Sequence, residues 1–281
     1  LSVAHAAALH EKKPLYEYLS VIARSNETKQ SSTQQDRHAS LAMTLPLPMM
    51  NIINGGKPLS GEVSIRGAKN ASFKQIIASM LSSETTYLSN IPQISDVNIT
   101  ESIAQSLGAK IIKSGPHSIE ITTKNLTSST VPHGTGEKSR TSFIFSAPLL
   151  ARTGHAVIPF PGGDKLGTRP LDRLFQCFAT MNIKTEEKGD LIIFSTNKIR
   201  ATNFTFVKPS HTVTETVIMT AVLADGTTIL HNTALEPEID DLIIMLNSMG
   251  AKITRDKAEP DKITITGVPS LHGTQHQVIA D

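Results

Sequence analysis

One stretch of the chain, residues 216–265, decides its fold and reads TVIMTAVLADGTTILHNTALEPEIDDLIIMLNSMGAKITRDKAEPDKITI. The spacing of its apolar residues predicts helices over 216–224 and 239–249 and strands over 227–231, 251–254 and 262–265. The first helix is apolar enough to lie inside a protein core. The stretch therefore predicts one unit in the order helix, strand, helix, strand, strand.

Two earlier segments of the chain follow the same order. The first predicts helices over 72–82 and 97–107, with strands over 85–91, 109–112 and 117–121. The second runs from residue 142 through 157–158, 171–181, 183–184 and 191–194. The lysines Lys110, Lys184 and Lys252 mark the same point in the three units, which indicates a repeat of about 70 residues.

Each unit is too small to bury both of its faces alone. We therefore expect an α/β fold in which three repeated helix–strand–helix–strand–strand units close around one shared core, with helices inside. Each unit ends in a hairpin, whereas a doubly wound sheet would continue into another crossover helix. The repeats thus favour a closed arrangement over a doubly wound sheet.

Composition and charge exclude several classes of protein. The 27 Lys and Arg against 25 Asp and Glu leave a formal net charge of +2, which gives no general case for binding nucleic acid or a membrane surface. The longest apolar runs are too short to span a bilayer, and no signal-peptide pattern opens the chain. We therefore expect a cytoplasmic protein.

Cysteine usage excludes two further features. The single cysteine, Cys177, cannot form an intramolecular disulfide, and its apolar helix face predicts a buried structural thiol. A metal site would need clustered histidines and carboxylates, and these are scattered along the sequence. Each histidine, including His211, is expected to be a surface or turn residue. We expect neither a metal nor a cofactor.

Three polar clusters interrupt the repeats at equivalent places. Gly67–Asn70 leads into the first helix of the first unit, where a helix cap with a surface lysine would explain it as well as an anion site. Pro161–Pro170 is longer than the matching turns and suits either a mobile loop that closes over a ligand or a plain surface loop. Lys208–Glu215 is a hydroxyl-rich turn before the third unit's first helix, which capping alone could explain.

Taken together, these clusters concentrate positive charge. Arg140 opens the first helix of the second unit, as Asn70 opens that of the first. The five cations at the repeat junctions are Lys69, Arg140, Lys165, Arg169 and Lys208. In a chain of net +2, they predict a small phosphorylated polyanion as the ligand.

Residues 54–281 resemble the N-terminal part of the enolpyruvyl transferases that act on UDP-N-acetylglucosamine. The matching stretches are GKPLSGEVSIRGAKNA at 56–71, PGGDKLGTRPLD at 161–172, EPEI at 236–239 and MGAKI at 249–253. The resemblance implies an inverse α/β prism-like fold. Shikimate-pathway transferases share the repeats but usually carry a serine-containing motif at the position of Lys69, so they are a distant alternative.

The resemblance implies transfer of the enolpyruvyl group from phosphoenolpyruvate to the 3′-hydroxyl of UDP-N-acetylglucosamine. Phosphate is released, and the step is the first committed one of peptidoglycan synthesis, with consequences for cell shape and division. Lys69, Arg140 and Arg169 would hold phosphoenolpyruvate, and Asp164 would donate the proton. The residues implied to bind the sugar nucleotide are Asn70, Pro170, Leu171, Asp172, Lys208, Ser210 and Thr212. No metal or cofactor is implied, because lysines and arginines stabilise the charge.

The sequence departs from this family's pattern in three places. Asp164 stands where most members have cysteine, which implies insensitivity to fosfomycin, an epoxide that alkylates the thiolate. Leu235 replaces an arginine that commonly precedes the Glu-Pro-Glu run and weakens one edge of the site. The family has six repeats in two domains, whereas three are recognised here. We therefore expect weak sugar-nucleotide binding without turnover by this chain alone. A non-catalytic fragment and a generic phosphoanion-binding scaffold stay open as alternatives.

Residues 1–56 resemble part of enolase, through VAHAAA at 3–8, PLYEYL at 14–19 and LPLPMMNIINGGK at 45–57. We expect an enolase-like helical segment and polar linker over 1–53, and the transferase domain over 54–281. Because NGGK at 54–57 suits both families, a joining of two genes would explain the boundary, and we expect the sequence to be cut at both ends. Enolase's magnesium ligands and catalytic lysines are not among these residues, so enolase activity is not expected.

Overall fold

The computed structural model describes residues 65–160 and 171–281. The chain divides into two compact units, Leu1–Ser64 and Ile65–Asp281. All the described elements belong to the second unit. The predicted enolase-like segment and the boundary at residues 53 and 54 lie outside the described residues.

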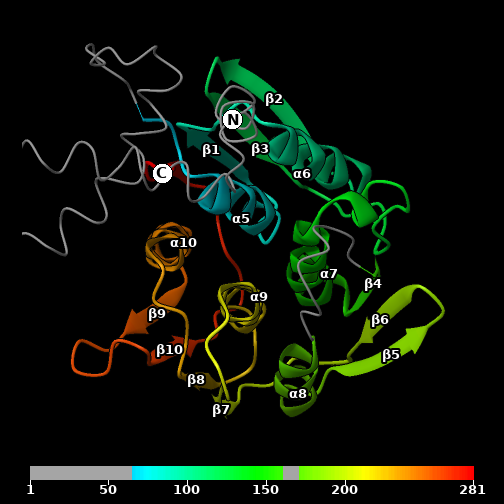
Figure 1. The fold of residues 1–281 in the computed structure, drawn as a ribbon, viewed down its shortest axis with the longest axis vertical. Helices are drawn as coiled ribbons and strands as arrows, with labels where there is room; N and C mark the ends of the chain where they lie inside the picture. The colour runs from blue at the N-terminus through cyan, green and yellow to red at the C-terminus, as the bar shows by residue number, and fades with distance from the viewer. Residues whose placement is uncertain (1–64, 161–170) are drawn as a thin grey trace, which may run out of the picture. The chain divides into compact units, whose positions relative to one another are not determined.

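The second unit contains three copies of the predicted element order (Figure 1). The first copy consists of α5 (Lys69–Ser79), β1 (Thr85–Ser89), α6 (Ser95–Ser106), β2 (Lys110–Gly115) and β3 (Ser118–Thr122). The second consists of the 3₁₀ helix η2 (Arg140–Phe145), α7 (Ser146–Thr153), β4 (His155–Pro159), α8 (Asp172–Thr180), β5 (Lys184–Lys188) and β6 (Leu191–Ser195). The third consists of α9 (His211–Ala221), β8 (Thr227–His231), α10 (Pro237–Ser248), β9 (Lys252–Arg255) and β10 (Ile263–Thr266). The marker lysines each begin the same strand of their copy, so the predicted repeat is confirmed.

The copies are joined into a ring by exchanged strands. The segment after each copy pairs in parallel with the first strand of the next: β7 (Asn203–Thr205) with β8, and Thr130 with Val157 of β4. β11 (Gln275–Gln277), which follows the third copy, pairs with β1 of the first. The sheet orders are β11-β1-β3-β2, β4-β6-β5 and β7-β8-β10-β9. Because the last copy supplies a strand to the first, the unit closes on itself.

The helices lie in the middle of this unit, with the three sheets around them (Figure 1). All nine residues from Ala71 to Ser79 of α5 are buried, as are all nine from Val213 to Ala221 of α9. One cluster of buried hydrophobic side chains runs through the three copies. The predicted α/β fold with a shared core and inward helices is confirmed.

Two helices begin at least three residues earlier than apolar spacing predicted. α5 begins at Lys69 instead of residue 72, and α9 begins at His211 instead of residue 216. Residues 211–215 of the hydroxyl-rich stretch predicted as a turn therefore belong to α9, whereas 208–210 precede it. Apolar periodicity detects buried apolar residues, and the buried residues of these first turns include the polar Ser72 and Thr214.

Two further predictions concern burial and length. Cys177 of α8 is buried as predicted, and this burial raises the pKa of its thiol to about 12.

None of the helices within 65–160 and 171–281 combines the length and the apolar character that a membrane crossing requires.

Candidate functional site

The first turns of α5, η2 and α9 begin at residues that the sequence singled out. η2 packs against both α5 and α9. Lys74 in the second turn of α5 forms an ion pair with Glu215 in the second turn of α9 at 2.5 Å. This pair joins the second turns of the two helices. The residues before the helices, Ala68 and Ser210, provide no side-chain cap, so among the described residues the first backbone N–H groups lack that partner and would favour an anion.

Lys69 and Asn70 are the first residues of α5, and both are exposed. The Lys69 ammonium lies 3.1 Å from Oδ2 of Asp96 in the first turn of α6, and the two side chains are 49% and 34% exposed. An ion pair this accessible contributes little stability. Lys69 can therefore exchange Asp96 for an incoming anion at small cost.

The backbone leading into α5 is tightly held. The Ala68 N–H donates to the carbonyl oxygen of Ile279 at 2.7 Å. A Cβ added at Gly67 would lie 1.9 Å from the carbonyl oxygen of Asn90, so this approach requires glycine. The glycine of the first polar cluster thus fixes the position from which Lys69 projects.

The third polar cluster lies at the start of α9, with Lys208 and Ser210 before the helix and Thr212 in its first turn. Lys208 is exposed, whereas Ser210 and Thr212 are half-buried. Thr212 Oγ1 lies 3.3 Å from Nδ1 of His211, whose side chain is 42% exposed, as expected for a surface residue. These groups place one cation and two hydroxyls near the free N–H groups of the helix.

The second copy supplies the other predicted site residues. Arg140 is the first residue of η2, and its side chain lies outside what is described. Leu171 is half-buried and Asp172 is the exposed first residue of α8. Asp164, Lys165, Arg169 and Pro170 fall in 161–170, outside the described residues. The structure thus packs η2 against α5 and α9 and links the second turns of α5 and α9, while the roles of the longest polar cluster stay predictions.

The connection that contains this cluster differs in length from its counterparts. Five residues, 90–94, join β1 to α6, and five, 232–236, join β8 to α10, whereas 160–171 is the corresponding stretch between β4 and α8. The predicted difference is therefore confirmed as an insertion at one place in the ring. Extra chain at one of three equivalent positions is typical of a functional loop.

A hollow at the other end of the unit provides a contrast. Residues at and just after the ends of α7 and α9 line this hollow, and Arg152, Lys198 and Asp225 are among its lining residues. The Arg152 guanidinium donates to carbonyl oxygens of Met80, Ser82, Thr123 and Lys124, and Lys198 pairs with Asp225 at 2.7 Å. Because four backbone carbonyl oxygens already bind Arg152, this hollow is a weaker candidate for an anion than the first turns.

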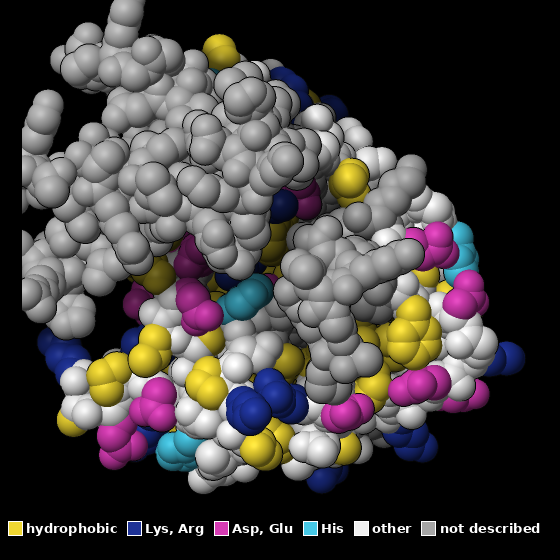
Figure 2. Space-filling view, in the orientation of Figure 1, with side chains coloured by type: hydrophobic (Ala, Val, Ile, Leu, Met, Phe, Trp, Pro, Cys, Tyr) yellow, Lys and Arg dark blue, Asp and Glu magenta, His cyan; other side chains and the backbone are white. Residues whose placement is uncertain are grey.

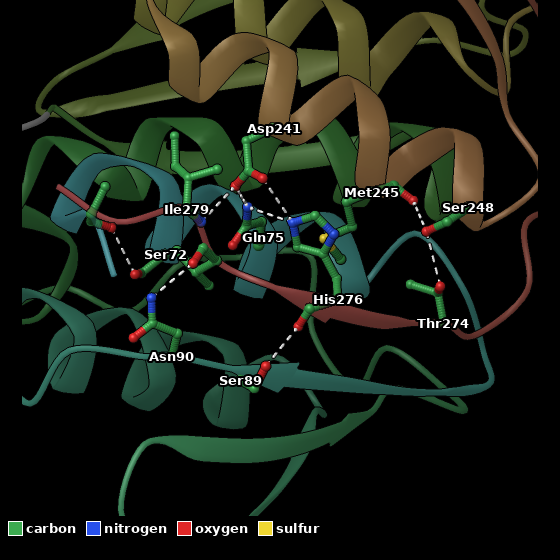
Figure 3. Close-up of polar contacts among 12 residues, drawn as sticks. Ser72, Gln75, Ser89, Asn90, Asp241, Met245, Ser248, Thr274, His276 and Ile279 are labelled. Carbon is green, nitrogen blue, oxygen red and sulfur yellow. Dashed lines mark hydrogen bonds and ion pairs between the residues drawn. The ribbon is translucent and has the colours of Figure 1, made fainter. Parts of the chain in front are cut away.

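Sequence analysis missed a set of buried polar residues beneath the site. Asp241 of α10 accepts hydrogen bonds from Gln75 of α5 and, at 3.4 Å, from the Ile279 N–H, and lies 3.0 Å from Nε2 of His276 (Figure 3). Lys74 and Glu215 are the other members. Lys74, inside the helix predicted over 72–82, was the available signal, because such a charge is buried only when paired. Glu215 fell in the predicted turn before the next core helix and gave no such signal.

The surface pattern agrees with a local site. On the visible part of one face, Lys and Arg side chains lie in several places among Asp and Glu side chains (Figure 2). Attraction for an anion therefore has to come from particular residues and helix ends, because charge of one sign does not dominate that face.

Comparison with known proteins places the fold in a family. The family model of EPSP synthase (3-phosphoshikimate 1-carboxyvinyltransferase) matches residues 53–281. The chain is 39% identical over 233 residues to UDP-N-acetylglucosamine 1-carboxyvinyltransferase of Prochlorococcus marinus strain NATL2A, covering 82% of this chain and 50% of that protein. It is 40% identical over 232 residues to UDP-N-acetylglucosamine 1-carboxyvinyltransferase 1 of Streptococcus agalactiae serotype Ia, covering 82% and 55%.

Solved structures agree on the fold. The enolpyruvyl transferase NikO from Streptomyces tendae superposes with a TM-score of 0.70 at 20% identity, covering 80% of this chain and 53% of that one. EPSP synthase from Acinetobacter baumannii gives a TM-score of 0.64 at 18% identity, covering 79% and 50%. The chain spans about half the length of the curated relatives it matches.

Proposed function

This chain belongs to the EPSP synthase family of enolpyruvyl transferases, and we propose that it serves the transfer of an enolpyruvyl group from phosphoenolpyruvate to UDP-N-acetylglucosamine. The observation that carries the choice of sugar nucleotide is the 39% identity, over 82% of the chain, to a relative named for that substrate. The exposed Lys69 beside uncapped helix ends supports a phosphorylated ligand. On this proposal the protein is a cytoplasmic enzyme of peptidoglycan synthesis, with consequences for cell shape and division.

The proposed chemistry is an addition followed by an elimination. The sugar 3′-hydroxyl gives its proton to a base as its oxygen bonds to C2 of phosphoenolpyruvate and C3 takes up a proton. The C2–O bond to phosphate then breaks, with its electron pair leaving on phosphate, as C3 gives up a proton. Lys69, Arg140 and Arg169 would hold the phosphate and carboxylate, and Asp164 would deliver the proton. Positive groups placed in advance lower the barrier where negative charge builds up. The reaction as written uses no metal or cofactor.

The remaining predicted residues would hold the sugar nucleotide. Asn70 stands beside Lys69 on α5 and would contact the sugar near the attacking hydroxyl. The first turn of α9 would bind the diphosphate through Lys208, Ser210 and Thr212. Pro170, Leu171 and Asp172, at and before the start of α8, would contact the uridine diphosphate moiety.

Calorimetric titration of the full chain tests the ligand. We expect UDP-N-acetylglucosamine to bind in preference to inorganic phosphate and to 3-phosphoshikimate, the substrate in the family model's name. Lys69→Ala should weaken binding of phosphoenolpyruvate, whereas Lys110→Ala, a matched exposed lysine on β2, should not. If inorganic phosphate bound as tightly as UDP-N-acetylglucosamine, the chain would be a generic phosphoanion-binding scaffold. Tighter binding of 3-phosphoshikimate would favour the shikimate-pathway branch of the family.

Phosphate release with both substrates present measures transfer itself. We expect little or no turnover from residues 1–281 by themselves. They span about half of the length of the relatives, and efficient catalysis needs groups that surround the reacting atoms in a closed cleft. Any activity should be insensitive to fosfomycin, since Asp164 offers no thiolate. Time-dependent inactivation by fosfomycin would contradict the assignment of Asp164.

A further inference from the structure

The ion pair between Lys74 and Glu215 is buried to an unusual degree. The two side chains are 1% and 0% exposed, and Nζ lies 2.5 Å from Oε2. Removing two charges from water costs more than their attraction returns unless the geometry is good and the remaining hydrogen-bonding positions are filled. Neither oxygen of Glu215 has a hydrogen bond among the described residues, so Oε2 meets Nζ as an ion pair only. The pair therefore contributes little net stability, and stability alone does not explain its presence.

Its position relates it to the candidate site. Lys74 lies five residues after Lys69 on α5, and Glu215 lies five residues after Ser210 on α9. The pair thus joins the turns directly beneath the two first turns. His211, exposed in the first turn of α9, lies 4.0 Å from Oε2 of Glu215, so the carboxylate borders the site.

The neighbouring contacts of the two helices are of another kind. α5 and α9 both pack against η2 and α10, whereas α6 packs against α5, and α7 and α8 pack against α9. Lys74 and Glu215 add a direct link between the two helices. Apolar contacts tolerate small shifts of one helix along another, whereas a short ion pair in a dry interior does not. The pair sets the relative height of α5 and α9.

We propose that Lys74 and Glu215 are positioning residues that hold Lys69 and Asn70 in register with Ser210 and Thr212. This inference rests on the proposed function, in which one UDP-N-acetylglucosamine molecule contacts both first turns. A ligand that spans two helices is sensitive to their spacing, because productive geometry requires groups to be placed within about 0.5 Å. Neither residue of the pair touches the ligand.

The test replaces both charges at once. Lys74→Met/Glu215→Leu removes the pair at similar volume and should unfold cooperatively within about 5 °C of the natural chain. UDP-N-acetylglucosamine affinity, measured calorimetrically, should nevertheless fall by about tenfold to a hundredfold. Lys74→Glu/Glu215→Lys restores a pair between the same positions and should recover part of that loss, which a packing role does not predict.

A second Lys–Glu pair supplies the matched control. Lys113 of β2 pairs with Glu101 of α6 at 2.5 Å and joins elements of the first copy only. Lys113→Met/Glu101→Leu should leave affinity within about twofold of the natural chain. If the Lys74/Glu215 neutral variant folds and binds like the natural chain, the inference is wrong.

A measurement without ligand separates this inference from the proposed function. Hydrogen–deuterium exchange of α5 and α9 amides should be about tenfold faster in the Lys74→Met/Glu215→Leu variant, while α6 amides stay unchanged. If the natural chain does not bind UDP-N-acetylglucosamine, the proposed function fails, and exchange alone decides the role of the pair. Unchanged exchange in α5 and α9 would overturn it.

Discussion

Where the first repeat meets the third, the helices are joined by buried polar groups, whereas the interior of the second repeat is aromatic. The polar junction consists of Lys74, Gln75, Glu215, Asp241 and His276. In the aromatic cluster, Phe143 and Phe178 contact Phe194 edge-on at centroid distances of 5.7 and 5.4 Å, and Phe175 lies 5.9 Å from it. One ring therefore uses buried polar contacts between two repeats and aromatic packing inside a third.

The difference lies in what each region specifies. Aromatic side chains stabilise the fold mainly through the apolar area that they remove from water. That area changes little when one helix shifts slightly against another. Buried polar groups add less net stability but accept only one arrangement, because every alternative leaves a partner unsatisfied. The polar junction lies beneath the first turns of α5 and α9, where alignment of two helices matters for a shared ligand.

The largest expected effect is at the polar junction. Glu215→Leu leaves the Lys74 ammonium buried without a counter-charge and should lower the free energy of unfolding by about 3–5 kcal/mol. Urea unfolding followed by circular dichroism measures the change. The additional substitution Lys74→Met should restore most of the loss, and failure to restore it would show that the charge is not the cause.

The aromatic cluster should respond through volume. Phe194→Ala removes the ring that three others contact and should cost about 3 kcal/mol in urea unfolding. The affinity of the folded variant for the sugar nucleotide should stay unchanged, because the aromatic cluster does not join α5 to α9. A parallel loss of affinity would remove the distinction between the two regions.

Asp241→Asn tests the second half of the polar junction. One oxygen of Asp241 accepts from Gln75 and the Ile279 N–H, and the other lies 3.0 Å from Nε2 of His276. Asparagine loses the charge that serves both contacts and must turn its N–H₂ group towards either the two donors or His276. We expect a loss of about 2 kcal/mol in unfolding free energy. Asp96→Asn, at an exposed carboxylate, is the control and should change stability much less.

Cys177, beside Phe178 in the second repeat, predicts a pH dependence. Burial raises its thiol pKa from 9.0 to about 12, so above about pH 9 the unfolded chain loses a proton that the folded chain keeps. Stability should therefore fall as pH rises between these values, by about 1.4 kcal/mol per pH unit from this group. The unfolding free energy is measured against pH for the natural chain and for Cys177→Ala, and the difference between the two isolates the thiol's contribution. If both proteins showed the same slope against pH, the prediction would be wrong.

The smallest effect is expected at the surface. A hydrogen bond and the charge of Lys198 lower the pKa of Asp225, whose stabilising contribution is therefore present above the ordinary aspartate range and lost as pH falls through the lowered pKa. Lys198→Ala should raise that pKa, as followed by carboxyl-carbon NMR. Its melting temperature at neutral pH should stay within about 2 °C of the natural chain.

Much of the candidate site was predictable because its residues mark local features. Lys69 follows a glycine at the start of an apolar helix, and Arg140 and Lys208 stand at the equivalent places of the other units. The starts of α5 and α9 were placed too late, since their first turns are polar. The roles of Asp164 and Arg169 stay predictions, because they lie outside the described residues.

The sequence by itself determined the three repeats, the inward helices and the buried Cys177, because these follow from apolar spacing within short segments. Only the tertiary structure decided which repeat exchanges a strand with which, and that Lys74 meets Glu215 across the core. The physical reason is that the partners are far apart in the chain. Spacing along the sequence predicts which face of a helix is buried, but the partner of a buried charge depends on how the closed ring brings the helices together.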